Sequence, residues 1–198
     1  MVTLPAYVFP FEGENFRDHV EYPRHFSQAE CAAIIAMGKS FPLEEGTVSQ
    51  ANHVDETMRK SNIHWMEYRA DHAWMWNKLS MLAQNSNREH FHFDIIGFFE
   101  NIQFTEYETI GAHYDWHVDF GSGSMGKRKL SIVVQLSDPA TYEGGDLQLF
   151  FDRKPYDVTR SLGTAVVFPS YTLHKVTPMT SGKRYSLVLW VSGKTQYK

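Results

Sequence analysis

The chain has 198 residues, of which 42% are hydrophobic and 15% aromatic, enough to bury the core of one domain. The formal net charge of −4 provides no overall basic field, so nucleic acid is not expected as a partner. The first residues do not place an apolar run after a basic region, and no run of about 18 apolar residues occurs. We therefore expect a soluble, cytoplasmic protein that does not bind a membrane.

Two helices are predicted in the first 91 residues, which we expect to support the rest of a single domain that spans residues 1–198. The first helix begins at residues 26–30, where Ser27 and Glu30 have the spacing of a capping box, and ends at Gly38. Within it, Cys31 is expected to be a packed residue. As the single cysteine it excludes an internal disulfide and fits a reducing compartment. The second predicted helix spans residues 71–84, and its aromatic side chains are expected in the core.

From residue 92 onward the sequence changes to short segments rich in β-branched and aromatic residues, which are typical of strands. Eight strands at this spacing fit a double-stranded β-helix, or jelly roll, in residues 92–192. The predicted fold class is therefore mainly β with flanking helices (α+β). The predicted strands are 98–106, 113–120, 129–136, 147–151, 156–160, 165–168, 172–176 and 185–191.

The second of these strands carries two His-x-Asp pairs, His113 with Asp115 and His117 with Asp119. Side chains two residues apart on a strand face the same way, about 7 Å apart, so all four would share one face. One ion cannot bind them all. With a second histidine, His174, either pair could form a facial triad, which leaves half of the coordination sphere of a ferrous ion open. His90 and His92 are also spaced as ligands, but we interpret them as structural or exposed.

The residues around the second pair distinguish the two. Gln103, Tyr107, Gly111, Tyr114, His117 and Asp119 match the pattern Q-x-x-x-Y-x-x-x-G-x-x-Y-x-x-H-x-D. The segment thus resembles the metal-binding core of the prolyl 4-hydroxylase-like Fe(II)/2-oxoglutarate dioxygenases. The resemblance extends over residues 98–192, about half of the chain, and implies that His117, Asp119 and His174 bind the metal. His113 and Asp115 are then expected to lie near the metal ligands without binding the metal.

The same resemblance implies a site for 2-oxoglutarate. Arg184, ten positions after His174, stands where the family binds the distal carboxylate, and a planar guanidinium suits that group. Ser186 should share the face of Arg184, whereas Lys183 should point the other way, unless a β-bulge exchanges the two basic residues. Tyr107, Gln103 and Tyr114 are implied as further cosubstrate-binding residues, with packing in the core as their alternative role.

The resemblance implies an Fe(II)- and 2-oxoglutarate-dependent dioxygenase that uses O2, hydroxylates an unactivated C–H bond and releases succinate and CO2. The sequence leaves a requirement for ascorbate undecided. The expected substrate is a proline-containing peptide or protein, with a free amino acid or another small molecule as the alternative. The polar segments 44–60 and 121–128 are expected to frame a groove for it. Trp116 is interpreted as packing on the opposite face of its strand, with a role as a platform for the substrate as the alternative.

Two other classes compete with this interpretation. A jelly-roll module without catalytic activity could hold a divalent ion and sense 2-oxoglutarate, but the complete set of ligands and Arg184 favours an enzyme. A zinc hydrolase could use similar ligands, but it would need a partnered general base, which the sequence does not indicate, and it would not need Arg184.

Overall fold

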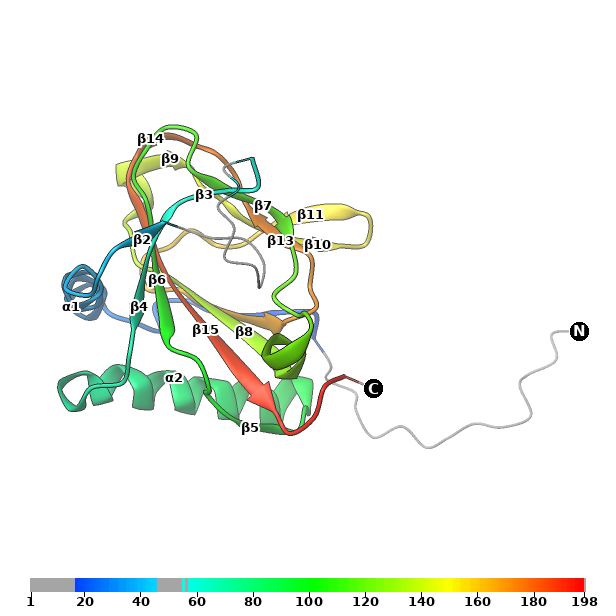
Figure 1. Ribbon diagram of the computed structural model, residues 1–198. Coiled ribbons are helices and arrows are strands. Elements are labelled where there is room, and N and C mark those ends of the chain that lie inside the picture. The colour runs from blue at the N-terminus through cyan, green and yellow to red at the C-terminus, as the bar shows by residue number, and fades with distance from the viewer. Residues whose placement is uncertain (1–16, 46–54, 56, 198) are drawn as a thin grey trace, which may run out of the picture.

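The computed structural model describes residues 17–45, 55 and 57–197. Two antiparallel sheets lie one above the other, and the helices lie on the side of the larger sheet that faces away from the smaller one (Figure 1). This arrangement confirms the predicted jelly roll with flanking helices. Most of the predicted loop 44–60 falls on residues 46–54 and 56, which lie outside the described residues, so its expected role stays a prediction.

The larger sheet has the strand order β1-β12-β8-β15-β6-β4-β2, with β5 beside β15. Its strands are β1 (Val20–Tyr22), β2 (Glu44–Glu45), β4 (Asn62–Met66), β5 (Ile95–Gly97), β6 (Ile102–Tyr107), β8 (Arg128–Gln135), β12 (Ala165–Pro169) and β15 (Arg184–Gly193). The smaller sheet has the order β11-β10-β13-β7-β3. Its strands are β3 (Arg59–Lys60), β7 (His113–His117), β10 (Leu147–Phe151), β11 (Lys154–Asp157) and β13 (His174–Val176). A separate pair is formed by β9 (Tyr142–Gly144) and β14 (Met179–Gly182).

The first 91 residues supply strands as well as the expected helices. β1 pairs with β12, β3 with β7 and β4 with β6, so both sheets extend across the boundary expected at residues 91 and 92. Pairing in this way covers edges of the core strands that would otherwise expose unpaired backbone groups.

Helix α1 (Gln28–Gly38) begins as predicted. Glu30 N donates to Ser27 Oγ at 3.2 Å, and Ser27 N donates to the Glu30 carboxylate at 2.7 Å, which completes the capping box. At the last residue of the helix, Gly38, a Cβ atom would lie 2.4 Å from the Phe104 ring. Glycine is therefore needed there for close packing of the helix on β6. Cys31 is buried, and burial raises the pKa of its thiol to about 11, as suits a packed side chain.

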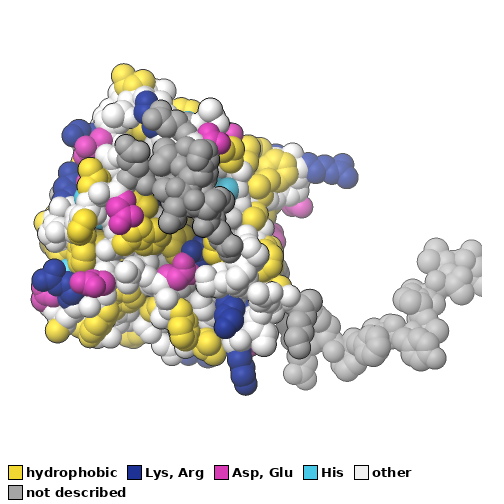
Figure 2. All heavy atoms as spheres, in the orientation of Figure 1, with side chains coloured by type: hydrophobic (Ala, Val, Ile, Leu, Met, Phe, Trp, Pro, Cys, Tyr) yellow, Lys and Arg dark blue, Asp and Glu magenta, His cyan; other side chains and the backbone are white. Residues whose placement is uncertain are grey.

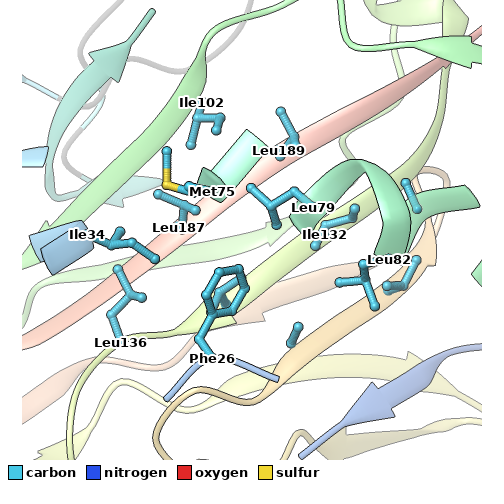
Figure 3. Packing of buried hydrophobic residues seen from close by; sticks show 14 of the residues in the cluster. Phe26, Ile34, Met75, Leu79, Leu82, Ile102, Ile132, Leu136, Leu187 and Leu189 are labelled. Carbon is cyan, nitrogen blue, oxygen red and sulfur yellow. The ribbon is translucent and has the colours of Figure 1, made fainter. Parts of the chain in front are cut away.

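The second predicted helix is α2 (Ala73–Ser86), which follows the 3-10 turn η1 (Ala70–His72) and continues into the π-helical turn η2 (Asn87–Phe91). Both helices pack on the larger sheet through one hydrophobic core (Figure 3). Among its buried residues are Phe26, Ile34, Met75, Leu79, Leu82, Ile102, Ile132, Leu136, Leu187 and Leu189. No helix in the described ranges is long and apolar enough to cross a membrane.

A second buried cluster lies between the two sheets and includes Tyr107, Val133, Leu149 and Phe168. It surrounds the site described below. On the face shown in Figure 2, Lys and Arg side chains are interspersed with Asp and Glu side chains rather than gathered in one region.

The predicted strands 98–106 and 156–160 have different bounds in the structure, as does the strand 113–120 described with the site below. The expected strand 98–106 begins only at Ile102, and residues 98–101 connect it to β5, which ends at Gly97 with a positive φ of 142°. The expected strand 156–160 is instead β11, Lys154–Asp157. It forms a hairpin with β10 around Asp152 and Arg153, both with positive φ, and this two-residue turn sets the register. The structure also includes 3-10 turns at Gly123–Lys127 (η3) and Pro139–Thr141 (η4).

Glu21 in β1 connects this hairpin to the larger sheet, and we expect it to stabilise the fold in a pH-dependent way. Its carboxylate accepts hydrogen bonds from Tyr156 Oη at 3.0 Å and Thr159 N at 3.1 Å. Burial raises the pKa of Glu21, but hydrogen bonds with His19, Thr159 and Tyr156 lower it from 4.5 to about 2. A lowered pKa means that the stabilisation is present above pH 4.5 and is lost as the pH falls towards 2.

Glu21→Gln is therefore expected to lower the free energy of unfolding near neutral pH by about 1–2 kcal/mol, which allows for solvent screening of a carboxylate that is partly exposed. Urea denaturation near neutral pH and again at about pH 3 should show the difference between the two proteins shrinking in acid. Glu67→Gln, at an exposed position, serves as the control. An equal difference at both pH values would contradict this role of Glu21.

Candidate metal and cosubstrate site

Two histidines from neighbouring strands and one aspartate converge between the sheets. His117 ends β7, His174 begins β13, and the two residues are paired in the antiparallel register, with ring centroids 4.1 Å apart. The Asp119 carboxylate lies 3.8 Å from His117 Nε2 and 3.6 Å from His174 Nε2. Ligand atoms of the three residues all lie within 4.8 Å of one another, and within the described residues no other such cluster of His, Cys, Asp or Glu occurs.

Asp119 lies beyond the end of β7, so strand geometry does not place its carboxylate beside the histidines. The expected strand 113–120 ends at His117, so the simple geometry of two side chains on one strand face is wrong. The backbone N–H groups of Asp119 and Phe120 instead both donate to the Ser170 carbonyl oxygen at 3.0 Å. Because the chain bends out of the sheet after His117, the carboxylate turns back towards both imidazoles, where Ser131 Oγ donates to its Oδ2 at 2.7 Å.

The first His-x-Asp pair lies outside the cluster. Asp115 is exposed, and its carboxylate accepts a hydrogen bond from Trp116 N at 2.8 Å. The His113 ring contacts the backbone oxygens of Gly111 and Thr57 at 2.8 and 3.1 Å. The structure thus brings His117, Asp119 and His174 together and leaves His113 and Asp115 on the periphery.

The protonation of the cluster suits a divalent ion. With Nδ1 as the donor, His117 binds the Asp115 carbonyl at 2.7 Å and His174 binds the Thr172 carbonyl at 2.8 Å, so each Nε2 faces the site. Burial and the nearby His174 lower the pKa of His117 to about 3, which keeps it neutral. Burial raises the pKa of Asp119, but attraction to the His174 and His117 rings in their charged forms and the hydrogen bond from the Ser131 hydroxyl lower it more, so the carboxylate is ionised. Two imidazoles and one carboxylate on one side of a cavity fit a ferrous facial triad.

The cluster opens into a cavity of about 360 Å³, which Arg184 lines as well. Arg184 is only 1% exposed, and its Nη2 donates to Gln135 Oε1 at 3.0 Å. Its Nε and Nη1 have no hydrogen-bond partner among the described residues. A buried guanidinium with unused donors is costly, so the position is suited to an anion that enters the cavity. A carboxylate matches the geometry of the free donors.

Ser186 and Lys183 lie on opposite sides of the sheet, as the alternation of side chains predicts. Ser186 lies buried and lines the same cavity, whereas Lys183 is exposed and lies 3.4 Å from Glu108. The Tyr107 ring lies 5.1 Å from the Arg184 guanidinium carbon. Gln103 also lines the cavity, where its Nε2 donates to Thr105 Oγ1 at 2.9 Å.

Tyr114 has a different position from the other predicted cosubstrate residues. Its ring stacks on the His117 imidazole, with centroids 3.5 Å apart and planes at 13°. The Arg59 guanidinium lies over the same tyrosine ring at 4.6 Å. Burial raises the pKa of Tyr114, so its phenol stays neutral beside the cluster. Tyr114 thus contacts a cluster histidine directly as well as lining the cavity.

Among the residues that line the cavity, Trp65, Glu100 and Trp190 are given no role by the sequence patterns. Trp65 and Trp190 lie on different strands with ring centroids 6.2 Å apart. Their positions depend on the pairing of β4 and β15 with β6, which no local pattern indicates. Met125 belongs to the predicted loop 121–128, so part of that loop does reach the cavity. Trp116 faces Phe150 and Lys175 instead, as expected.

Comparisons with known proteins agree with this geometry. Residues 102–192 match the family model described as the 2OG-Fe(II) oxygenase superfamily. A PKHD-type hydroxylase from Synechococcus sp. (strain CC9605) is 43% identical over 86 residues, which are 42% of this chain and 38% of the relative. Another, from Shewanella sp. (strain MR-7), is 37% identical over 84 residues, with the same two shares. The match therefore spans about two fifths of the length of these curated relatives.

Two solved structures share the fold. A Pseudomonas putida prolyl-4-hydroxylase has a TM-score of 0.72 at 23% identity, over 89% of this chain and 93% of that chain. A Trichoplax adhaerens prolyl hydroxylase in complex with a hypoxia inducible factor oxygen degradation domain peptide fragment has a TM-score of 0.75 at 16% identity. That match covers 89% of this chain and 84% of the other.

Proposed function

We propose that this chain, whose residues 102–192 match the 2OG-Fe(II) oxygenase superfamily, is an Fe(II)- and 2-oxoglutarate-dependent dioxygenase that hydroxylates an unactivated C–H bond. The observation that carries the proposal is the juxtaposition of two sites in one cavity. The His117, Asp119 and His174 cluster forms one, and the unused donors of the buried Arg184 form the other.

Each residue has a role that follows from its contacts. His117 Nε2, His174 Nε2 and the Asp119 carboxylate would hold the metal on one side and leave its other positions open to the cavity. Bound ferrous iron, with 2-oxoglutarate and O2, would supply the oxidative chemistry that yields succinate, CO2 and a hydroxylated product. Arg184 would bind the distal carboxylate of the cosubstrate through its Nε and Nη1 groups, and Ser186 would add a hydroxyl.

The remaining predicted residues shape the cavity around these groups. Tyr107, Gln103 and Tyr114 would line the cosubstrate, and the Tyr114 ring would also stack on the His117 imidazole. The buried walls would exclude water from the ion pair between Arg184 and the cosubstrate, which strengthens that pair.

For the substrate we propose a proline-containing peptide or protein. The solved Trichoplax relative holds a peptide fragment, and other relatives are named prolyl hydroxylases or PKHD-type hydroxylases. In this chain the indoles of Trp65 and Trp190 give the cavity apolar walls that suit an aliphatic ring. A free amino acid or another small molecule is the alternative substrate class, because this fold hosts many substrates.

Succinate formation tests the proposal directly. The iron-loaded protein is incubated with 2-oxoglutarate and O2, with and without ascorbate, alone and with panels of prolyl peptides and free amino acids. Succinate that rises with a prolyl peptide, together with the mass gain of one oxygen atom on that peptide, is the expected result. If only a free amino acid increased succinate formation, the protein would be a small-molecule oxygenase. Bound iron and 2-oxoglutarate without any succinate would instead favour a binding module.

A further inference from the structure

We propose that Arg128 is a positioning residue of the metal site, which holds the backbone of Asp119 while Glu100 holds Arg128. The inference rests on the proposed function, because it concerns how the metal carboxylate is kept in place. It begins from the position of Asp119 beyond the end of β7, where sheet pairing no longer holds the chain.

Every nitrogen of the Arg128 guanidinium is used. Nε donates to Glu100 Oε1 at 2.7 Å, Nη2 donates to Glu100 Oε2, and Nη1 donates to the Asp119 carbonyl oxygen at 3.1 Å. The guanidinium carbon also lies 3.8 Å from the centroid of the Trp190 ring. Arg128 is only 7% exposed, so solvent hardly competes for these bonds. A planar guanidinium has enough donors to bind a carboxylate and a carbonyl oxygen at the same time, whereas the single ammonium group of lysine cannot reproduce this geometry.

The bond from Arg128 completes a set of three anchors on Asp119. Ser170 accepts from the backbone N–H of Asp119 at 3.0 Å, and Ser131 donates to carboxylate Oδ2 at 2.7 Å. Arg128 adds the third anchor at the carbonyl oxygen, so the peptide on each side of Asp119 and its side chain are all held. Together they leave Oδ1 directed towards His117 Nε2, at 3.8 Å.

Arg128 also closes the base of a loop. Asp119 and Arg128 flank residues 120–127, which include the 3-10 turn Gly123–Lys127, and Ser124 and Met125 of that turn line the cavity. Glu100 comes from the chain before β6, so the ion pair joins this loop to another part of the cavity wall. Breaking the pair should therefore release the carboxylate and the loop together.

A purely structural role can be distinguished by a matched residue. Arg160 has the same kinds of contact: an ion pair with Asp146 at 3.3 Å, a hydrogen bond to the Tyr142 carbonyl at 2.9 Å and a position 4.4 Å over the Tyr142 ring. It does not line the cavity and touches none of the three cluster residues. Arg160 is the more exposed of the two, with 33% of its side chain accessible against 8% for Arg128, so loss of Mn(II) affinity is compared with loss of thermal stability in each variant. If Arg128 acted only by stabilising the fold, the two losses should rise together in both variants.

The test is a titration with Mn(II) alone, followed by electron paramagnetic resonance, together with thermal unfolding of each protein. Arg128→Lys is expected to weaken Mn(II) binding about 10- to 100-fold, as outer contacts of metal ligands do. Glu100→Gln, a milder change that keeps the shape, should weaken it less. The double variant should lose no more than Arg128→Lys, because both act through one contact. Arg160→Lys should bind Mn(II) as the unmodified protein does.

Unchanged Mn(II) affinity in Arg128→Lys would overturn the inference and leave the proposed function intact. An equal loss of affinity in Arg160→Lys would also overturn it, since the effect would then follow stability alone. If the unmodified protein failed to bind Mn(II), the proposed function itself would fail, and the inference with it.

Discussion

Asp119→Ala is expected to abolish metal-dependent turnover and to weaken Mn(II) binding by at least about 100-fold, the upper end of the effect of an outer contact. The substitution removes the only anionic donor of the cluster that the described residues provide. It also leaves the Ser131 hydroxyl without the carboxylate oxygen to which it donates at 2.7 Å. Titration with Mn(II) and succinate formation measure the two effects separately.

Asp115→Ala is the matched control, because it removes the same group from the other His-x-Asp pair. Asp115 is exposed, and its carboxylate contacts only neighbouring backbone among the contacts described here. Metal affinity close to that of the unmodified protein is expected. A comparable loss in both variants would show that the choice between the two pairs is wrong.

The second large effect is expected at Arg184. Arg184→Ala should raise the concentration of 2-oxoglutarate needed for half-maximal succinate formation by about 30-fold or more, because loss of one partner of a buried, hydrogen-bonded ion pair costs about 2–5 kcal/mol. The physical reason is burial: at 1% exposure, the guanidinium would meet the cosubstrate carboxylate with almost no screening by water. Arg184→Lys should raise the required 2-oxoglutarate concentration less than Arg184→Ala does, since lysine keeps the positive charge but cannot form two parallel hydrogen bonds.

Lys183→Ala controls for the loss of a positive charge nearby. Lys183 points to solvent and pairs with Glu108 at 3.4 Å, so its removal should leave the 2-oxoglutarate requirement nearly unchanged. A larger effect for Lys183 than for Arg184 would place the cosubstrate elsewhere. The stabilisation of the protein by 2-oxoglutarate in thermal unfolding provides a second readout that does not depend on turnover.

Together the two substitutions separate metal binding from cosubstrate binding. Arg184→Ala should retain Mn(II) binding, because Arg184 contacts Gln135 and Tyr107 rather than the cluster. Asp119→Ala should lose it. Loss of Mn(II) binding in both variants would mean that the cavity collapses without Arg184, and the separate roles proposed here would need revision.

Local features of the sequence predicted the elements whose stabilising contacts are close in the chain. The capping box of Ser27 and Glu30 joins residues three apart, so the start of α1 could be predicted. Alternation along β15 similarly indicated that Arg184 and Ser186 share one face. The predicted strand 98–106 begins too early, at Phe98 rather than Ile102. Apolar residues follow Gly97 directly, and the positive φ of Gly97 is not visible in the sequence.

For the site, the sequence by itself determined that the side chains needed to bind a metal ion and a carboxylate are present. The pattern from Gln103 to Asp119 also indicated which of the two His-x-Asp pairs is the metal-binding one. Only the tertiary structure decided how Asp119 reaches the histidines, because its position depends on hydrogen bonds to Ser170, Ser131 and Arg128. These partners lie 9 to 51 residues away in the chain, and strand pairing brings them together. The unused donors of Arg184 could likewise be recognised only after burial was known, since the same guanidinium in water would find its hydrogen bonds there.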